Sequence, residues 1–207
     1  MSGDARRLLV ATRSEGKLRE LTGLFADAGW QLLTLGEAGI APSSAEDAIE
    51  AFETFEENAL AKARHFHALS GLPTVADDSG LVVDALGGAP GVRSKRWSAA
   101  PGLEGRALDA ANNARLLQTL EAAVERTARF VCAAAFVDGT RELVTLGTCE
   151  GRIGYTPQGG GGFGYDPLFI SDELERTLAE ASPTEKSAVS HRGRAFRALL
   201  GRLGDPA

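Results

Sequence analysis

The chain has 207 residues, a formal net charge of −6 and 43% hydrophobic residues. This length suits one large domain, or a domain with a small lobe, and the apolar content is sufficient for a real core. The acidic balance argues against a nucleic-acid coat or a membrane-surface protein, but it does not exclude a small anionic substrate, because a local site can oppose the net charge.

The N-terminal part of the chain predicts alternating strands and helices. The apolar run Leu8–Ala11 is typical of a buried strand. Apolar residues at helical spacing predict a helix over 17–28, which Gly29 would end. A second strand is expected at 30–35. A second helix is expected over 52–71, where phenylalanines and alanines share one face.

Two adjacent carboxylates follow the third predicted strand. This strand covers 73–76 and ends on Asp77 and Asp78, and the chain continues extended over 81–86. Like charges at the end of a buried strand are costly to hold. Neighbouring side chains of an extended segment point to opposite faces, so we expect one aspartate to face a site and the other to brace a loop.

The C-terminal part adds antiparallel structure. We expect, in order, a helix over 108–126, a β-hairpin over 128–151 that turns at Asp138-Gly139, a glycine-rich loop over 157–167, and helices over 171–182 and 190–203. Early alternation of strands and helices, followed by a hairpin, indicates an α/β fold with a mixed sheet. No repeat or linker divides the chain, so we expect a single domain over 1–207.

The cysteine pattern and the N-terminus bear on location. Cys132 and Cys149 show no CxxC spacing, which favours buried reduced thiols over a disulfide. The N-terminal segment has no long apolar stretch, so no signal peptide is expected, and the apolar runs are too short for a membrane span. We therefore expect a soluble cytoplasmic protein with neither a membrane nor a nucleic-acid partner.

The segment "VATRSEGK" predicts a strand, a short loop and the start of a helix. The free N–H groups of a helix N-terminus suit a phosphate, and Arg13 and Lys17 add positive charge. The segment is not a Walker A loop, because the first glycine is missing and Leu18 stands where Ser or Thr would hold Mg²⁺. An ordinary strand–loop–helix with surface charges is the alternative.

The segment "GGGGFGYDP" combines glycines with two aromatic residues. Glycines let a backbone approach a ligand closely, and the flat faces of Phe163 and Tyr165 suit stacking on a base. Asp166 could accept a hydrogen bond from a base edge or orient a neighbour. The alternative is a flexible loop with two core aromatics.

Charged residues near the C-terminus and near the third strand complete the candidates. In "EKSAVSHRGRA", Lys186, His191 and Arg192 supply donors for phosphates or base carbonyls, with a solvated polar face as the alternative. Carboxylates at the carboxyl end of a strand, beside a phosphate-binding loop, are well placed to hold a hard divalent cation, and the acidic residues here are Glu50, Asp77 and Asp78. Such a cation would offset the charges that burial penalises.

Five motifs, in this order, resemble the inosine triphosphate pyrophosphatase family of house-cleaning nucleotide hydrolases: "ATRSEGKLREL", "TFEENALAKA", "ADDSGLVVDALGGAPGVRSKRW", "GGFGYDPLF" and "EKSAVSHRGRA". The resemblance spans nearly the whole chain. It implies an elongated mixed α/β fold with a central substrate cleft between two lobes, and usually a homodimer. It also implies Mg²⁺-dependent hydrolysis of noncanonical purine triphosphates (ITP, dITP and XTP) to the monophosphate and pyrophosphate.

The resemblance also assigns roles to residues. Asp78 matches the catalytic carboxylate and a metal ligand, and Glu50 matches a second metal ligand. Nucleotide contacts fall on Thr12, Arg13, Ser14, Glu15, Gly16, Lys17, Lys62, Ser79, Phe163, Gly164, Tyr165, Asp166, Lys186, His191 and Arg192. Phe163 is expected to stack on the base, and Arg192 to read its 6-keto edge.

The chain departs from the family pattern in three places. Ser14 replaces an asparagine and lacks its amide donor, so we expect one substrate contact to be lost or carried by water. Ala51-Phe52 replaces Thr-Gly after Glu50, so the geometry of Glu50 as a metal ligand is expected to differ from the family pattern. Arg93, Lys95 and Trp97 stand where the family more often has Tyr, Ala and Tyr, and the first two add positive charge near the cleft or the dimer surface.

Three other readings compete with the pyrophosphatase. One is a hydrolase of other altered nucleotides in the related Maf-like group, which lacks "FGYDP" and "SHR". Another is a nucleotide sensor without turnover, which has little need for Glu50 and Asp78 around a metal. The third, a scaffold protein, leaves the paired aspartates and the glycine loop unexplained.

Overall fold

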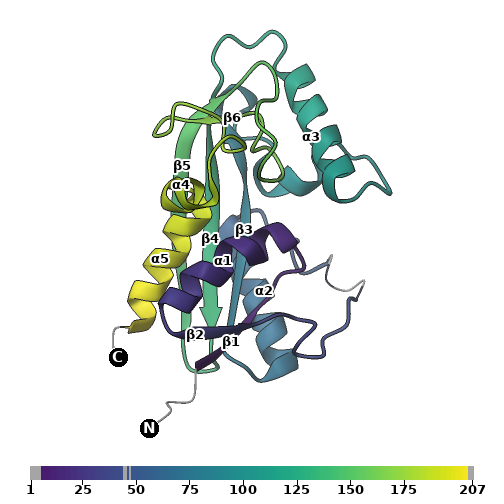
Figure 1. Ribbon diagram of the computed structural model, residues 1–207. Helices are drawn as coiled ribbons and strands as arrows, with labels where there is room; N and C mark the ends of the chain where they lie inside the picture. The colour runs from purple at the N-terminus through teal and green to yellow at the C-terminus, as the bar shows by residue number, and fades with distance from the viewer. Residues whose placement is uncertain (1–5, 44–45, 47, 205–207) are drawn as a thin grey trace. The chain divides into compact units, whose positions relative to one another are not determined.

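The computed structural model describes residues 6–43, 46 and 48–204 (Figure 1). Residues 1–5 begin the N-terminal segment in which no signal peptide is expected, and they lie outside the described residues. The chain divides into two compact units. The first unit comprises the residues up to Asp78, the segment Cys132–Gly147 and the residues from Arg192 onward. The second unit comprises Ser79–Val131 and Thr148–His191.

Six strands form one sheet in the order β2-β1-β3-β4-β5-β6. The strands are β1 (Arg6–Val10), β2 (Trp30–Leu33), β3 (Thr74–Val83), β4 (Thr127–Val137), β5 (Glu142–Ile153) and β6 (Phe169–Ser171). Strand β1 runs parallel to both β2 and β3, whereas β6 runs antiparallel to β5. The predicted mixed sheet is therefore confirmed, and so is the hairpin, which joins β4 to β5.

Five α-helices and two short 3₁₀ helices lie within the described residues. They are α1 (Glu15–Asp27), α2 (Phe55–Ser70), α3 (Gly105–Thr119), α4 (Pro183–Val189) and α5 (His191–Gly204), with η2 (Asp84–Leu86) and η3 (Gly91–Arg96). The side chains of Ser14 and Thr54 cap α1 and α2 by accepting backbone hydrogen bonds from the first turn. None of the described helices is both long enough and apolar enough to span a membrane.

Alternating side chains of β1 and β3 build the core of the first unit. Leu8, Val10 and Val75 belong to one buried cluster, which includes Phe25 of α1 and Phe196 of α5. The neighbouring strand residues Leu9 and Ala76 belong to a second buried cluster. That cluster also includes Ala59, Ala63 and Phe66 of α2. Because strand side chains alternate between faces, β3 carries one face toward α1 and α5 and the other toward α2.

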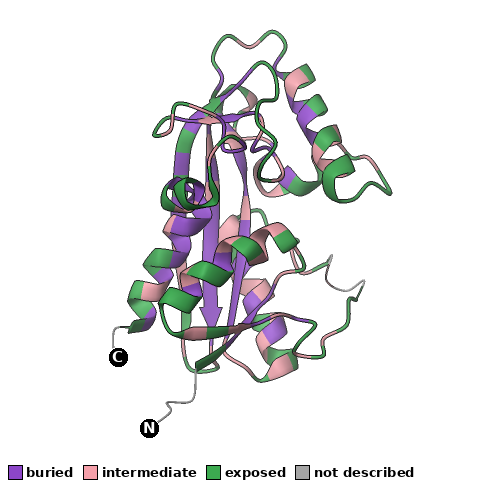
Figure 2. Cartoon of the chain, in the orientation of Figure 1, coloured by how far each residue is buried: buried purple, intermediate pink, exposed green. Residues whose placement is uncertain are grey.

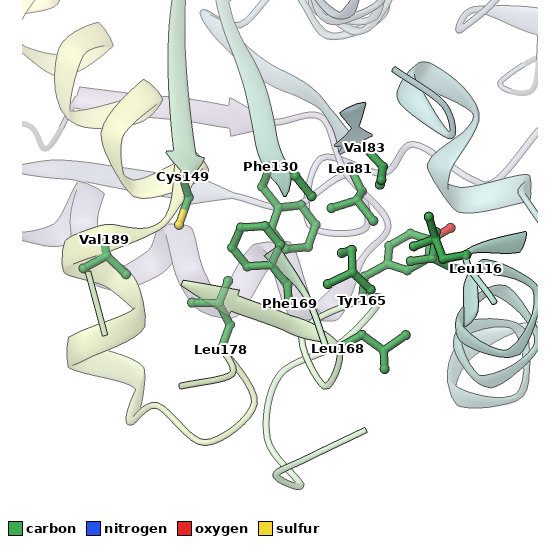
Figure 3. Close-up of a cluster of buried hydrophobic side chains, with 13 residues drawn as sticks. Leu81, Val83, Leu116, Phe130, Cys149, Tyr165, Leu168, Phe169, Leu178 and Val189 are labelled. Atoms are coloured by element: carbon green, nitrogen blue, oxygen red, sulfur yellow. The ribbon is translucent and has the colours of Figure 1, made fainter. Parts of the chain in front are cut away.

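The core of the second unit gathers aromatic and aliphatic side chains from several segments. Leu81 and Val83 of β3 belong to it, with Phe130 of β4 and Phe169 of β6 (Figure 3). The rings of Phe130 and Phe169 have centroids 4.6 Å apart. This cluster also takes in Tyr165, so the glycine loop is rooted in a packed core.

The part of strand β4 that lies in the first unit is buried throughout. All of its residues from Cys132 to Val137 are buried, and Figure 2 shows this stretch in purple. A strand covered on both faces reads as a continuous apolar run, as "CAAAFV" does. Cys132 and Cys149 are both buried free thiols, as predicted.

Two predictions of secondary structure were wrong. No helix covers 171–182: residues 169–171 pair with β5, turns follow, and the helix α4 begins only at Pro183. Leucines four residues apart imitated a helical pattern, but Ser182 and Glu185 form a capping box that starts a helix at Pro183.

The third predicted strand does not end at the aspartates. Strand β3 runs unbroken for ten residues, from Thr74 to Val83, so Asp77 and Asp78 lie in its middle. Smaller boundary shifts include the third helix, which covers 105–119 rather than 108–126. The side chains that surround Asp77 and Asp78 explain how a strand interior can hold two carboxylates.

Candidate functional site

The middle of β3 carries a group of polar side chains in the first unit. We call it the β3 polar cluster; its members are Lys17, Glu20, Glu50, Asn58, Lys62, Asp77, Asp78 and Arg192. The two aspartates are 1% and 7% exposed. They continue the alternation of Val75 and Ala76, so Asp77 faces α1 and α5 while Asp78 faces α2.

Two cations neutralise Asp77. Its Oδ2 lies 3.0 Å from the Lys17 ammonium and accepts a hydrogen bond of 3.1 Å from Arg192 Nε. Arg192 also donates to Glu20 of α1 at 2.5 Å. Burial alone would raise the pKa of Asp77, but Lys17 and Arg192 outweigh burial and lower that pKa well below its ordinary value. Asp77 is therefore a fixed anion that ties α1 and α5 to β3.

The loop before α1 is ordered by its own side chains. Ser14 N–H donates to Thr12 Oγ1, and Ser14 Oγ accepts from Lys17 N–H. Arg13 instead donates to the Glu46 carboxylate and to a backbone carbonyl. Burial lowers the pKa of Lys17, and Asp77 only partly opposes that effect. The N-terminus of α1 thus presents free N–H groups beside a buried lysine, an arrangement that suits a phosphate.

Asp78 lies in a different environment from its neighbour. Asn58 Nδ2 donates to its Oδ2 at 3.0 Å. Burial and the nearby Glu50 carboxylate raise the pKa of Asp78 to about 6, against the opposing effect of Lys17 and Lys62. Of the two adjacent aspartates, only Asp78 therefore titrates near neutral pH, as a general base must.

Lys62 of α2 connects the two halves of the cluster. Its ammonium pairs with Glu50 and donates to the backbone carbonyl of Asp77 at 2.9 Å. Burial would lower the pKa of Lys62, but Glu50 and Asp77 outweigh burial and raise it. Asn58 adds a second link, because its amide exchanges hydrogen bonds with the backbone of Phe52, two residues after Glu50.

The second unit holds the glycine-rich segment, of which Gly162–Asp166 is called here the aromatic loop. Asp166 Oδ2 accepts from Phe163 N–H at 2.8 Å and from Lys186 Nζ at 2.6 Å. The same ammonium lies 4.7 Å from the centroid of the Phe163 ring, a cation–π contact. A Cβ on Gly162 would come within 2.1 Å of Asp166 Oδ2, so glycine is required there.

The two aromatic residues of the loop have different roles. Phe163 is partly exposed, whereas Tyr165 is only 4% exposed and donates its hydroxyl to Ser94 O at 2.8 Å. Tyr165 is therefore an anchor in the core, as the alternative interpretation expected, and Phe163 is the ring available for stacking. His191, also in the second unit, stacks on Phe130 with centroids 4.7 Å apart.

The structure groups most of the predicted residues, each within its own unit. Glu50, Lys17, Lys62, Asp78 and Arg192 meet in the β3 polar cluster, and Phe163, Gly164, Asp166 and Lys186 meet around the aromatic loop. Six supporting residues were not predicted from the sequence: Glu20, Asn58, Ser94, Asp109, Asn112 and Asn113. Because asparagine is unfavourable inside a helix, its presence in the predicted helices could have singled out Asn58, Asn112 and Asn113.

The first unit thus defines an α/β protein that brings together a helix N-terminus, two lysines and a carboxylate of raised pKa. A model of the Ham1 family matches residues 8–202, and the chain belongs to the Ham1 family. A dITP/XTP pyrophosphatase of Ralstonia nicotianae is 45% identical over 201 residues, which cover 96% of each chain.

Solved structures agree with this assignment. A HAM1 protein from Coxiella burnetii superposes with a TM-score of 0.81 and 37% identity, covering 95% of this chain and 98% of that chain. A nucleoside-triphosphatase / dITP/XTP pyrophosphatase from Mycobacterium abscessus gives a TM-score of 0.71 and 46% identity over 94% of this chain and 98% of that chain. The family resemblance drawn from the five motifs and the predicted fold class are confirmed.

Proposed function

We propose that this protein is an enzyme that hydrolyses noncanonical purine nucleoside triphosphates (dITP, ITP and XTP) to the monophosphate and pyrophosphate, and so removes them from the nucleotide pool. The names of its relatives support this substrate class. The observation that carries the proposal is Asp78, a buried carboxylate with a pKa of about 6 beside two lysines. A nucleotide sensor has no need for such a group.

The triphosphate binds at the loop of residues 12–17 in this proposal. The N-terminus of α1 offers backbone N–H groups, and Lys17 and Lys62 supply charge that offsets the triphosphate and the departing pyrophosphate. Both lysines already pair with anions of the cluster. Their side chains are therefore held in position before a substrate arrives, which reduces the entropy lost on binding.

Asp78 positions and deprotonates the attacking water. A general base works best when its pKa lies near the working pH, and in the absence of a metal ion burial and Glu50 raise the pKa of Asp78 toward that range. Asn58 holds one carboxylate oxygen, which leaves the rotamer of Asp78 fixed. Attack at the α-phosphorus then releases pyrophosphate in one piece.

Glu50 and Asp78 fit a hard divalent cation, which we propose to be Mg²⁺. Their mutual repulsion, which contributes to the raised pKa of Asp78, is the signature of an oxygen site that a cation would stabilise. Across residues 6–43, 46 and 48–204, no three His, Cys, Asp or Glu side chains gather in a metal-binding group. Two carboxylates with substrate phosphates are nevertheless the usual Mg²⁺ set. When bound, the ion offsets phosphate charge.

The nucleoside binds at the aromatic loop. Phe163 stacks on the base, with Lys186 and Asp166 beside it, and Ser79, Gly164 and His191 complete the nucleotide contacts. Arg192 is proposed to read the 6-keto edge, although its guanidinium in this structure pairs with Asp77 and Glu20, so reading the base requires it to exchange partners. Adenine would face these donors with its own amino donor, which disfavours it.

The test is release of pyrophosphate and orthophosphate from ITP, XTP, GTP and ATP, with and without Mg²⁺. We expect pyrophosphate from ITP and XTP alone, dependent on metal, and a rate lower by about 10²–10⁴-fold for Asp78→Asn. Tight ITP binding without release would favour the sensor, and orthophosphate would place the attack at the γ-phosphorus. We further propose a homodimer, which sedimentation of the purified protein would test, and a cytoplasmic location, which fractionation of cells would test.

A further inference from the structure

Helix α3 carries three polar residues whose role the proposed function leaves unexplained. Asp109, Asn112 and Asn113 lie within five positions, and the two asparagines are buried, at 3% and 9% exposure. Asparagine is unfavourable in a helix interior, and a buried side-chain amide is costly unless it has hydrogen-bond partners. Their partners therefore show what these side chains do.

Asp109 and Asn113 hold the backbone of a single residue of the aromatic loop. Gly164 N–H donates to Asp109 Oδ2 at 2.9 Å, and Asn113 Nδ2 donates to Gly164 O at 3.0 Å. The two side chains stand at i and i+4, so one face of α3 presents both. Both hydrogen-bonding groups of this glycine are thus held from the same helix.

The adjacent asparagine has a different task. Asn112 Oδ1 accepts from Ser98 N–H at 2.7 Å, and its Nδ2 donates to Lys95 O at 3.1 Å. It therefore holds the end of η3 and makes no hydrogen bond to the aromatic loop. Asn112 and Asn113 share a side-chain type, are similarly buried and are neighbours in sequence, although, among the described residues, Asn112 bonds through both amide atoms and Asn113 through Nδ2 alone. Asn112 is therefore the control for Asn113.

The aromatic loop needs this support because its two glycines allow the unsupported backbone many conformations. Gly162 and Gly164 flank Phe163 with φ of +70° and +63°, and glycine loses more conformational entropy on ordering than any other residue. Asp166 fixes the N–H of Phe163. The bonds from α3 fix the next residue. The backbone that carries the Phe163 ring is consequently held by hydrogen bonds on both sides of the Phe163 α-carbon.

We propose that Asp109 and Asn113 are positioning residues that fix Gly164, and through it the Phe163 ring, and thereby set the affinity for the nucleoside half of the substrate. The nature of that ligand rests on the proposed function. The triphosphate half binds at the first unit in that proposal, so its affinity is independent of these residues. A ring fixed in advance loses less entropy when a base stacks on it.

The binding test uses inosine, which has the base without phosphates, and inorganic triphosphate, which has phosphates without the base. For Asn113→Ala we expect inosine to bind about tenfold more weakly, and triphosphate within about twofold of wild type. The KM for ITP rises to a similar extent while kcat stays within about threefold. Asn112→Ala is the control; we expect it to lower the melting temperature comparably but to leave inosine affinity within about twofold.

A second readout follows the loop directly. In the NMR spectrum of the whole protein, the Gly164 amide should exchange with solvent at least about tenfold faster in Asp109→Ala. Asp109→Asn keeps an oxygen acceptor and should restore most of the protection. Equal loss of inosine affinity in Asn112→Ala and Asn113→Ala would overturn the proposal, as would faster Gly164 exchange with unchanged inosine affinity.

The outcomes separate this proposal from the proposed function. If the wild-type protein binds inosine but releases no pyrophosphate, the proposed hydrolysis fails while the role of Asp109 and Asn113 stands. If it releases pyrophosphate from ITP but the Asn113→Ala variant keeps the wild-type KM, the hydrolysis stands and the positioning role fails.

Discussion

The β3 polar cluster and the aromatic loop both hold their side chains in fixed positions, but they do so through different kinds of contact. In the cluster, charged side chains hold one another: Asp77 pairs with Lys17 and Arg192. In the aromatic loop, side chains hold backbone, and the groups that matter most are Gly162 and Gly164. The cluster should therefore be sensitive to charge, and the loop to shape.

The largest expected effect comes from removing one charge of the cluster. Asp77→Asn removes the buried anion that Lys17 and Arg192 share and leaves Arg192 with Glu20, which we expect to cost about 3–5 kcal/mol of unfolding free energy. Urea denaturation measures it. Glu142→Gln is the control, because its pair with Arg64 is exposed and should cost less than about 1 kcal/mol. Equal effects for the two variants would show that the cluster does not depend on charge.

Three glycine variants test the dependence of the loop on shape. Gly162→Ala combines positive φ with a Cβ that would come within 2.1 Å of Asp166 Oδ2, so we expect a loss of about 2–4 kcal/mol. Gly164→Ala has positive φ but open space, which should cost about 1–2 kcal/mol. Gly160→Ala has neither and should change stability by less than about 0.5 kcal/mol. Any other ranking by thermal unfolding contradicts this account of the loop.

The smallest effect concerns pH and separates the two aspartates. Asp78 has a pKa of about 6 when folded, against about 3.9 when unfolded. Between these values the folded state binds more protons, so without divalent cations stability should fall by about 1–3 kcal/mol as pH rises from 4 to 7. Asp78→Asn should lack that fall and match wild type at pH 4. The pKa of Asp77 is lowered, so its contribution is already present above pH of about 4 and is lost only below it.

The sequence predicted the parts of the molecule that depend on local pattern. Helices α1 and α2, strands β1 and β2 and the β4–β5 hairpin follow from apolar spacing and turn residues. Alternation also predicted that Asp77 and Asp78 face opposite ways. It could not say which partners each would meet, because Arg192 lies 115 residues from Asp77 in the chain. Contacts at that separation leave no local signal.

The failures have the same origin. The segment 171–182 looked helical because its leucines repeat at helical spacing, but pairing of Phe169–Ser171 with β5 prevailed over that local preference. The roles of Asn58 and Asn113 stayed hidden because Asn58 bonds to strand β3, 20 residues along the chain, and Asn113 bonds to the aromatic loop, 51 residues along the chain. In the candidate site, residue types were predictable from motifs, whereas the supporting bonds required the fold.

The interleaved order of the two units has a consequence for biosynthesis. Leu8 and Val10 share a buried cluster with Phe196 and Leu199 of α5, so β1 emerges from the ribosome long before that helix exists. All residues of the second unit are translated before α5 is complete. The apolar face of β1 that packs in the cluster with α5 therefore lacks that helix during most of translation. In this period, exposed apolar surface and unpaired strand edges are open to misassociation.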